Sequence, residues 1–253
     1  MPLDLAFLLP PGLDPLVALG LLALSFVASL ITATFTLGGG VLMLAVLALV
    51  FPPAIVVPLH GAVQVGSNAG RAFMLRRFIA WKNVRWLALG ALLGTIVGAP
   101  VAAFLPAEIF QIVIALFIIV TTWLPNPKVT DHSPMAQVIG GTIISALGML
   151  VGATGPLVAL FLRGIKDRQV LVGTHAAIMT IQNTFKIGGF VVLGFAFAAY
   201  LPLVIGMVLC GFAGTAVGGG FLTKISERAF RLGFRIMLTV MALYLLVEAL
   251  GLF

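Results

Sequence analysis

Two stretches of this sequence carry the same polar side chains at the same spacing. Each has a histidine, then an asparagine, then a cation: His60, Asn68 and Arg71 in the first stretch, and His175, Asn183 and Lys186 in the second. Every member of the first set lies 115 positions before its counterpart. Positions i, i+8 and i+11 share one face of a helix. The sequence therefore predicts two equivalent polar helix faces.

These residue types suit the recognition of an oxyanion inside a membrane. Arg71 offers a planar fork of donors and Lys186 offers a point charge. His60 and His175 could bind the anion or carry a proton, because imidazole titrates near neutral pH. Ionisable groups at membrane depth are costly and by default mark a functional pathway. We predict one shared, membrane-embedded anion site, with the two histidines as proton-coupling candidates.

Neutral donors complete the predicted site. Amide and hydroxyl groups bind anionic oxygens without adding charge, and those on the two faces are Gln64, Ser67, Asn68, Gln182 and Asn183. Breaks in the apolar segments can point backbone N–H groups at an anion, and the residues there are Gly39, Gly40, Thr154 and Gly155. Polar amides are also ordinary contacts between membrane helices, so both interpretations stay open for each of them.

The composition indicates an all-α polytopic membrane protein. Of the 253 residues, 62% are hydrophobic and 8% are charged, whereas a soluble domain is about 25% charged. Repeated apolar runs of about 20 residues favour helices over a barrel. The net charge of +7 comes mostly from three short clusters of Lys and Arg, at 76–85, 163–168 and 224–235. Such clustering is typical of cytoplasmic loops and predicts no nucleic-acid partner.

The helices that must position the two faces follow from the apolar segments. We expect helical segments at 16–50 (interrupted at 36–40), 54–74, 85–105, 108–123, 135–162 (interrupted at 152–156), 170–193, 200–222 and 230–250. The most polar stretch between them divides the chain nearly in half. The predicted organisation is a first transmembrane repeat at 1–124, a linker at 125–134 and a second transmembrane repeat at 135–253.

The loop charges predict how the halves are oriented. If all three basic clusters are cytoplasmic, the segment 135–162 must return to its own side, as a re-entrant hairpin or as two short passes. The two halves are then inverted, with about eight main spans and a broken or re-entrant first segment in each repeat. Inverted repeats are typical of secondary transporters, whose sites lie at the repeat interface. Eight simple spans with parallel halves are the alternative, and would place one basic loop outside.

Two further features limit the chemistry and processing of the chain. Cys210 is the single cysteine, so no disulfide can form within the chain. No Lys or Arg precedes Arg71, so we expect no cleaved signal peptide. Neither polar helix has a Cys, Asp or Glu near its histidine, which makes a metal site poor. We expect no metal and no cofactor.

The order of motifs resembles the sulfite exporter TauE/SafE family, also called the TSUP family of transporters. In the first half the resemblance rests on Gly38-Gly39-Gly40, the Pro-bearing turn, the polar helix, the basic loop and the glycine-spaced helix with Gly90, Gly94 and Gly98. In the second half it rests on Gly173-Thr174-His175, a Gly-rich helix and Phe230 to Phe234. The family's repeats commonly have Gly-Thr-Ser before the polar helix, whereas this chain has Pro58-Leu59-His60 in the first repeat and Gly173-Thr174-His175 in the second. The resemblance implies transport of sulfite or organosulfonates such as sulfoacetate.

We therefore expect a secondary transporter of small sulfur-containing anions in the bacterial cytoplasmic (inner) membrane, working by alternating access and coupled to protons through the histidines. A passive anion channel built from the same residues is the alternative. An enzyme is not expected, because no carboxylate pair, three-ligand metal set or nucleophile–base pair is evident in the spans. The predicted partners are the sulfur oxyanion or sulfonate and the lipid bilayer, and the sequence leaves a homodimer open.

Overall fold

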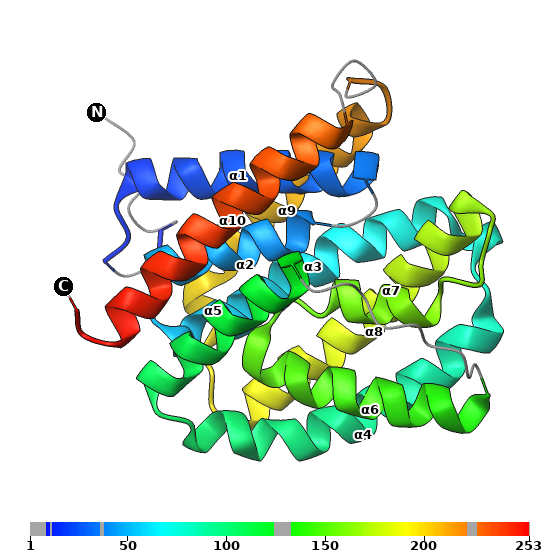
Figure 1. Cartoon of the computed structure of the whole chain (residues 1–253), viewed down its shortest axis with the longest axis horizontal. Coiled ribbons are helices and arrows are strands. Elements are labelled where there is room, and N and C mark those ends of the chain that lie inside the picture. Colours follow the sequence, from blue (N-terminus) through cyan, green and yellow to red (C-terminus); the bar gives the residue numbers. More distant parts are fainter. Residues whose placement is uncertain (1–8, 11, 36–37, 124–132, 222–226, 253) are drawn as a thin grey trace.

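The computed structural model describes residues 9–10, 12–35, 38–123, 133–221 and 227–252. Most of these residues are helical (Figure 1). The α-helices are α1 (Pro15–Phe35), α2 (Gly39–Val50), α3 (Pro53–Met74), α4 (Trp81–Phe104), α5 (Ala107–Trp123), α6 (Pro134–Val151), α7 (Gly155–Phe161), α8 (Arg168–Val192), α9 (Leu201–Phe221) and α10 (Glu227–Ala249). Two 3₁₀ turns, η2 (Arg76–Phe78) and η3 (Phe197–Tyr200), join α3 to α4 and lead into α9.

The two expected interruptions are present. Gly38 precedes α2 with φ of 110°, and Gly152 follows α6 with φ of 77°. Side chains with a Cβ rarely adopt such positive φ values, so glycine at these two positions allows the helix to stop and restart. The predictions that 16–50 and 135–162 are each broken apolar segments are therefore confirmed. Each break places the start of a short helix, α2 or α7, inside the protein.

α3 and α8, which carry the polar faces, form the centre of the fold. They pack against each other along their length in opposite directions. Gly173 near the start of α8 faces Leu75 at the end of α3, while Gly61 near the start of α3 faces Lys186 in the second half of α8. The Asp167 side chain caps α8 by accepting from the backbone N–H groups of Gln169 and Val170 at 2.8 and 2.9 Å.

Apolar helices flank this polar pair on both sides. The most extensive contacts are α4 with α6 and α1 with α9, and α4 also packs on α8 while α9 packs on α3 (Figure 1). Close approach depends on glycine: a Cβ at Gly94 would collide with the Thr142 carbonyl oxygen of α6, and one at Gly214 with the Phe26 carbonyl oxygen of α1. Small residues allow membrane helices to pack this closely.

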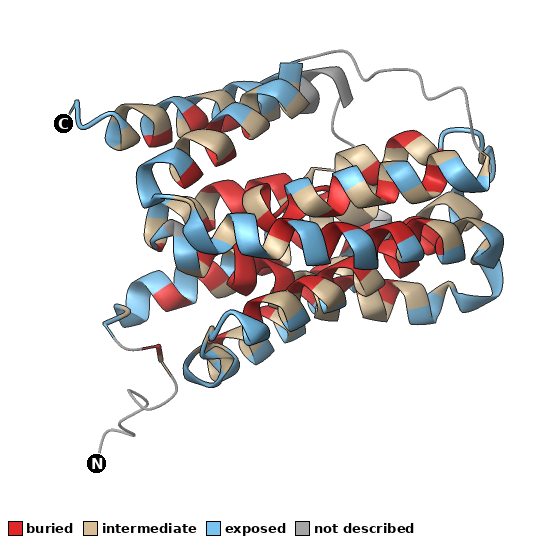
Figure 2. Cartoon of the chain, turned by 90° about the horizontal axis from the view of Figure 1, so that it is seen from below, coloured by how far each residue is buried: buried red, intermediate tan, exposed pale blue. Residues whose placement is uncertain are grey.

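The outer surface is apolar, whereas the interior also contains buried polar and charged side chains. Five helical stretches are long and apolar enough to cross a membrane, namely Pro15–Thr34, Trp81–Phe104, Pro134–Val151, Phe197–Gly218 and Leu232–Ala249. Their exposed faces surround the buried centre (Figure 2). α3 and α8 are long enough to span but are not among the five. The chain is an integral membrane protein, and the number of about eight spans stays a prediction.

The first two basic clusters lie at the same end of the molecule. The Ala80 backbone N–H, next to η2, donates to the Thr174 hydroxyl near the start of α8 at 2.9 Å. Arg76 and Arg77 in η2 and Arg163 and Lys166 before α8 are exposed there. Of the third cluster, Lys224 lies outside the described residues, as does the predicted linker apart from Ser133 and Pro134.

Candidate functional site

The two polar faces make equivalent local contacts, although they belong to different halves of the chain. His60 Nε2 donates to the Gly40 carbonyl oxygen, and His175 Nε2 donates to the Gly155 carbonyl oxygen, both at 3.0 Å and both across 20 residues. A carbonyl oxygen only accepts, so Nε2 carries the proton in each ring. Each histidine thus ties a central helix to the start of the short helix that follows a break.

The two asparagines are also equivalent. Asn68 Nδ2 donates to the Gln64 carbonyl oxygen and Asn183 Nδ2 donates to the Met179 carbonyl oxygen, both at 2.8 Å. These intrahelical bonds fix the amides so that Oδ1 turns toward the cation three residues later. The spacing seen in the sequence therefore corresponds to one local arrangement that is built twice.

The two cations differ sharply in their surroundings. Lys186 is 1% exposed, and its Nζ donates to the Gly152 carbonyl oxygen at 2.6 Å and to Asn183 Oδ1 at 3.1 Å. Arg71 is 6% exposed, and its Nη1 reaches Asn68 Oδ1 only at 3.5 Å. Within the described part of the chain, Arg71 Nε and Nη2 have no hydrogen-bond partner. A buried guanidinium with an unpaired donor fork is a strong candidate for anion binding.

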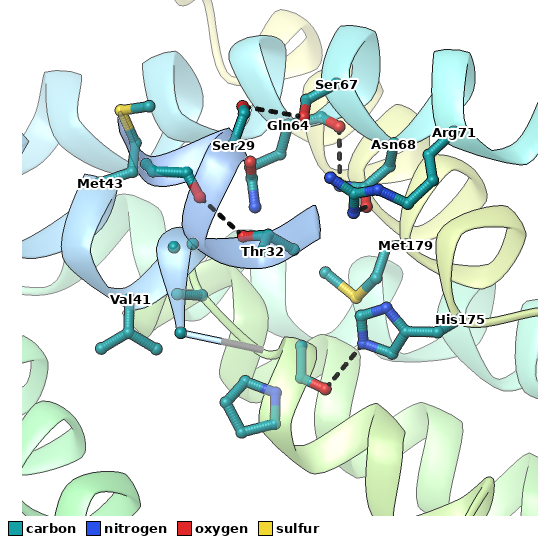
Figure 3. A pocket seen from close by; sticks show the side chains of 17 residues that line it. Ser29, Thr32, Val41, Met43, Gln64, Ser67, Asn68, Arg71, His175 and Met179 are labelled. Carbon is teal, nitrogen blue, oxygen red and sulfur yellow. Dashed lines mark hydrogen bonds between the residues drawn. The ribbon is translucent and has the colours of Figure 1, made fainter. Parts of the chain in front are cut away.

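A cavity of about 30 Å³ lies beside Arg71. Figure 3 shows Arg71 and Asn68 reaching toward it from α3, with His175 and Met179 facing it from α8. Its polar lining comes from Ser29, Thr32, Gln64, Ser67, Asn68, Arg71 and His175, together with Gly38, Gly39, Gly40 and Gly155 at the two breaks. Among the described residues that line it there is no carboxylate, and Arg71 is the one permanent cation.

The cavity thus unites residues from both halves, and it contains eight of the thirteen predicted site residues: Gly39, Gly40, Gln64, Ser67, Asn68, Arg71, Gly155 and His175. Five predicted residues do not line it: His60, Thr154, Gln182, Asn183 and Lys186. All five are nevertheless buried. The structure therefore separates the predicted set into a group around Arg71 and a group around Lys186.

Sequence reasoning missed the contribution of α1. Ser29 and Thr32 line the cavity, and the Ser29 hydroxyl lies 3.4 Å from the Ser67 hydroxyl. With Ser25 they follow the spacing i, i+4 and i+7 along an otherwise apolar segment. This stripe of hydroxyls on one helix face was a signal that could have placed α1 beside the polar helices.

The described residues hold no group of three or more His, Cys, Asp or Glu side chains that could bind a metal ion. The chemistry available is instead that of donors. Arg71, the Ser and Thr hydroxyls and the side-chain amides can all donate hydrogen bonds to one small ligand. A cavity with one cation, several neutral donors and no carboxylate is suited to an anion rather than to a cation.

A methyl group at Gly40, but not at the equivalent Gly155, should weaken anion binding. A Cβ at Gly40 would lie 2.8 Å from Gln64 Nε2 and displace that amide, whereas a Cβ at Gly155 would rest 3.5 Å from the His175 ring in ordinary contact. We expect Gly40→Ala to lower anion affinity about tenfold, the equivalent of about 1.4 kcal/mol. Gly155→Ala is the matched control, and equal losses in both variants, measured by anion-dependent thermal shift, would contradict this.

Comparison with known proteins identifies one family. The family model described as Sulfite exporter TauE/SafE matches residues 21–245, which is nearly the whole chain. The matched range includes every residue that is described as lining the cavity. No curated protein and no solved structure matches the chain.

Proposed function

The chain belongs to the sulfite exporter TauE/SafE family, and on that premise we propose that it carries a small sulfur oxyanion, sulfite first, across the membrane by way of the Arg71 cavity. Proteins of this family are membrane transporters of anions and not enzymes. The observation that carries the proposal is the buried Arg71 guanidinium, whose Nε and Nη2 lack partners among the described residues and face a cavity without carboxylates.

The cavity dimensions favour an inorganic oxyanion over an organosulfonate. A cavity of about 30 Å³ has room for about two water molecules, since one needs about 10–15 Å³ on this measure. The sulfonates suggested by the sequence, such as sulfoacetate, carry carbon atoms and a second charged group. Among the described residues, the lining supplies one permanent cation, so a second anionic group on the ligand would lack a counter-charge.

Alternating access between two inverted repeats is part of the proposal. The order α1 to α5 is matched by the order α6 to α10, and the contact of α1 with α9 corresponds to that of α6 with α4. The antiparallel α3 and α8, with equivalent histidine–carbonyl bonds, support the same arrangement. Sites at such repeat interfaces are exposed alternately to the two sides. We place the protein in the bacterial cytoplasmic membrane, and a homodimer stays a prediction.

A thermal-shift screen of the purified protein tests the anion. We expect sulfite to raise the unfolding temperature more than sulfoacetate, taurine or small carboxylates, because a ligand that binds only the folded state stabilises it. The absence of stabilisation by every sulfur anion would contradict the proposal.

Flux in proteoliposomes tests the mode of transport. Sulfite flux should respond to a pH gradient if His60 or His175 carries a proton during the cycle. Ionic currents far above transporter turnover would favour the passive channel instead.

A further inference from the structure

A second set of buried polar groups has no role in the Arg71 cavity. Ser145 Oγ, Thr154 Oγ1, His60 Nδ1 and both polar atoms of the Gln182 amide are buried without a hydrogen-bond partner within the described residues. Each of these side chains is at most 2% exposed. Buried polar groups are normally satisfied, and leaving one without a partner is destabilising. The concentration of several unsatisfied groups in one region indicates hydrogen-bond partners that this conformation does not provide.

These groups lie close together. Ser145 and Gln182 line one small cavity of about 10 Å³. Gln182 and Thr154 both face Gly148, where a Cβ would lie 3.5 Å from Gln182 Nε2 and 3.6 Å from Thr154 Oγ1. His60 Nδ1 faces Gly152, whose carbonyl oxygen binds Lys186. We refer to Ser145, Thr154, Gln182, His60 and Lys186 as the Lys186 cluster.

The Lys186 cluster is the counterpart of the Arg71 cavity in the other half of the chain. Gln182 lies 115 positions after Ser67, and Lys186 lies 115 positions after Arg71. The cavity combines Arg71 of the first half of the chain with His175 of the second half. The cluster combines Lys186 of the second half with His60 of the first half. Because α3 and α8 are antiparallel, the two pairs are separated along the helix axes by roughly 17 Å, at about 1.5 Å per residue.

The chemistry of the cluster matches that of the cavity. Two hydroxyls, one amide and one ammonium are donors suited to an oxyanion, and the cluster contains no carboxylate. The difference is that Lys186 is held by the Gly152 carbonyl oxygen at 2.6 Å, at the break after α6. The small cavity beside Ser145 and Gln182 has room for about one water molecule, which is too little for an oxyanion.

We propose that the Lys186 cluster is a second half-site for the transported anion, closed in this conformation, which forms when Lys186 leaves the Gly152 carbonyl and the unpartnered donors close on the anion. The inference rests on the proposed function, since it assigns the second position of the same anion along the α3–α8 interface. In the conformation seen here the Arg71 cavity is formed and the Lys186 cluster is collapsed. The opposite conformation reverses the two.

Removing the unpartnered donors separates this proposal from ordinary packing. Gln182→Leu and Ser145→Ala delete groups without a hydrogen-bond partner among the described residues, so the protein should unfold at an unchanged or higher temperature. Sulfite should still shift the unfolding temperature, because the Arg71 cavity is intact. Sulfite flux in proteoliposomes should nevertheless fall at least about tenfold, equivalent to about 1.4 kcal/mol at the second position.

Thr180→Val is the matched control on α8, since the Thr180 hydroxyl donates to the Ala176 carbonyl oxygen within its own helix. Its flux should stay close to that of the wild type. Wild-type flux in both Gln182→Leu and Ser145→Ala would overturn the second half-site, and so would loss of sulfite binding together with flux, since that places these donors in one shared site. Absence of sulfite binding and flux in the wild type would instead remove the proposed function itself, and the half-site with it.

Discussion

Replacing Arg71 by glutamine is expected to lower the affinity for sulfite about 30-fold or more. Loss of one partner from a buried, hydrogen-bonded charge pair removes about 2–5 kcal/mol, and each 1.4 kcal/mol is a factor of ten. The same substitution should leave the anion-free protein as stable as the wild type or more stable, because Arg71 has no ion-pair partner among the described residues. A buried charge without a partner is destabilising.

Because Arg71→Gln is expected to lower sulfite affinity without lowering the stability of the anion-free protein, one experiment can distinguish a binding role from a structural one. Sulfite titrations followed by thermal unfolding would report both the anion-free stability and the affinity. Arg76→Gln is the matched control, because Arg76 lies in η2, just after α3. It is exposed, and its guanidinium stacks over the Phe73 ring at 4.7 Å. If Arg71→Gln binds sulfite as the wild type does, the cavity is not the anion site. If it unfolds well below the wild type without ligand, Arg71 serves the fold instead.

Adding one methyl group at Gly94 is expected to destabilise the whole protein. A Cβ there would collide with the Thr142 carbonyl oxygen and lie 2.8 Å from the Ser145 Cβ, so α4 and α6 would have to separate. Overpacking of this kind typically removes about 1–3 kcal/mol. For a chain of this size the unfolding temperature should fall by roughly 5 °C, with α4–α6, one of the two most extensive helix contacts, disrupted.

Gly188 provides the matched control within a helix. A Cβ at Gly188 would meet nothing within 4 Å, and the residue lies in the interior of α8. Alanine is favoured over glycine in a helix by up to about 1 kcal/mol, so Gly188→Ala should unfold at the same or a higher temperature. Equal decreases for both variants would contradict close packing of α4 on α6 as the cause, because helix propensity alone favours alanine at both positions.

Much of the helical architecture was predictable because the signals are local. The breaks at Gly38–Gly40 and Gly152–Pro156, the two polar helices and the apolar helices around them follow from glycine, proline and hydropathy along the chain. The observed α4 begins at Trp81 and α10 at Glu227, a few residues earlier than predicted. The sequence at both starts is polar and charged, so the first turn of each helix leaves no apolar signal.

The residue types of the site were predictable from the sequence, but the separation of these residues into the Arg71 cavity and the Lys186 cluster was not. The sequence places His60, Asn68 and Arg71 in strict correspondence with His175, Asn183 and Lys186, and so suggests one symmetric site. Among the described residues, Arg71 Nε and Nη2 have no partner beside the cavity, whereas Lys186 donates to two oxygen acceptors. The decisive contact, between Lys186 and the Gly152 carbonyl, joins residues 34 positions apart, and no local pattern encodes it.

The sequence by itself determined the residue types, their doubled spacing and the membrane environment, because periodicity and hydropathy act between neighbours in the chain. Only the tertiary structure decided which cation faces a cavity, and that Ser29 and Thr32 of α1 belong to its lining. The physical reason is that the unpaired state of a buried donor depends on every helix packed around it. A repeated sequence can therefore fold into two equivalent frameworks while only one of them is formed around an open site.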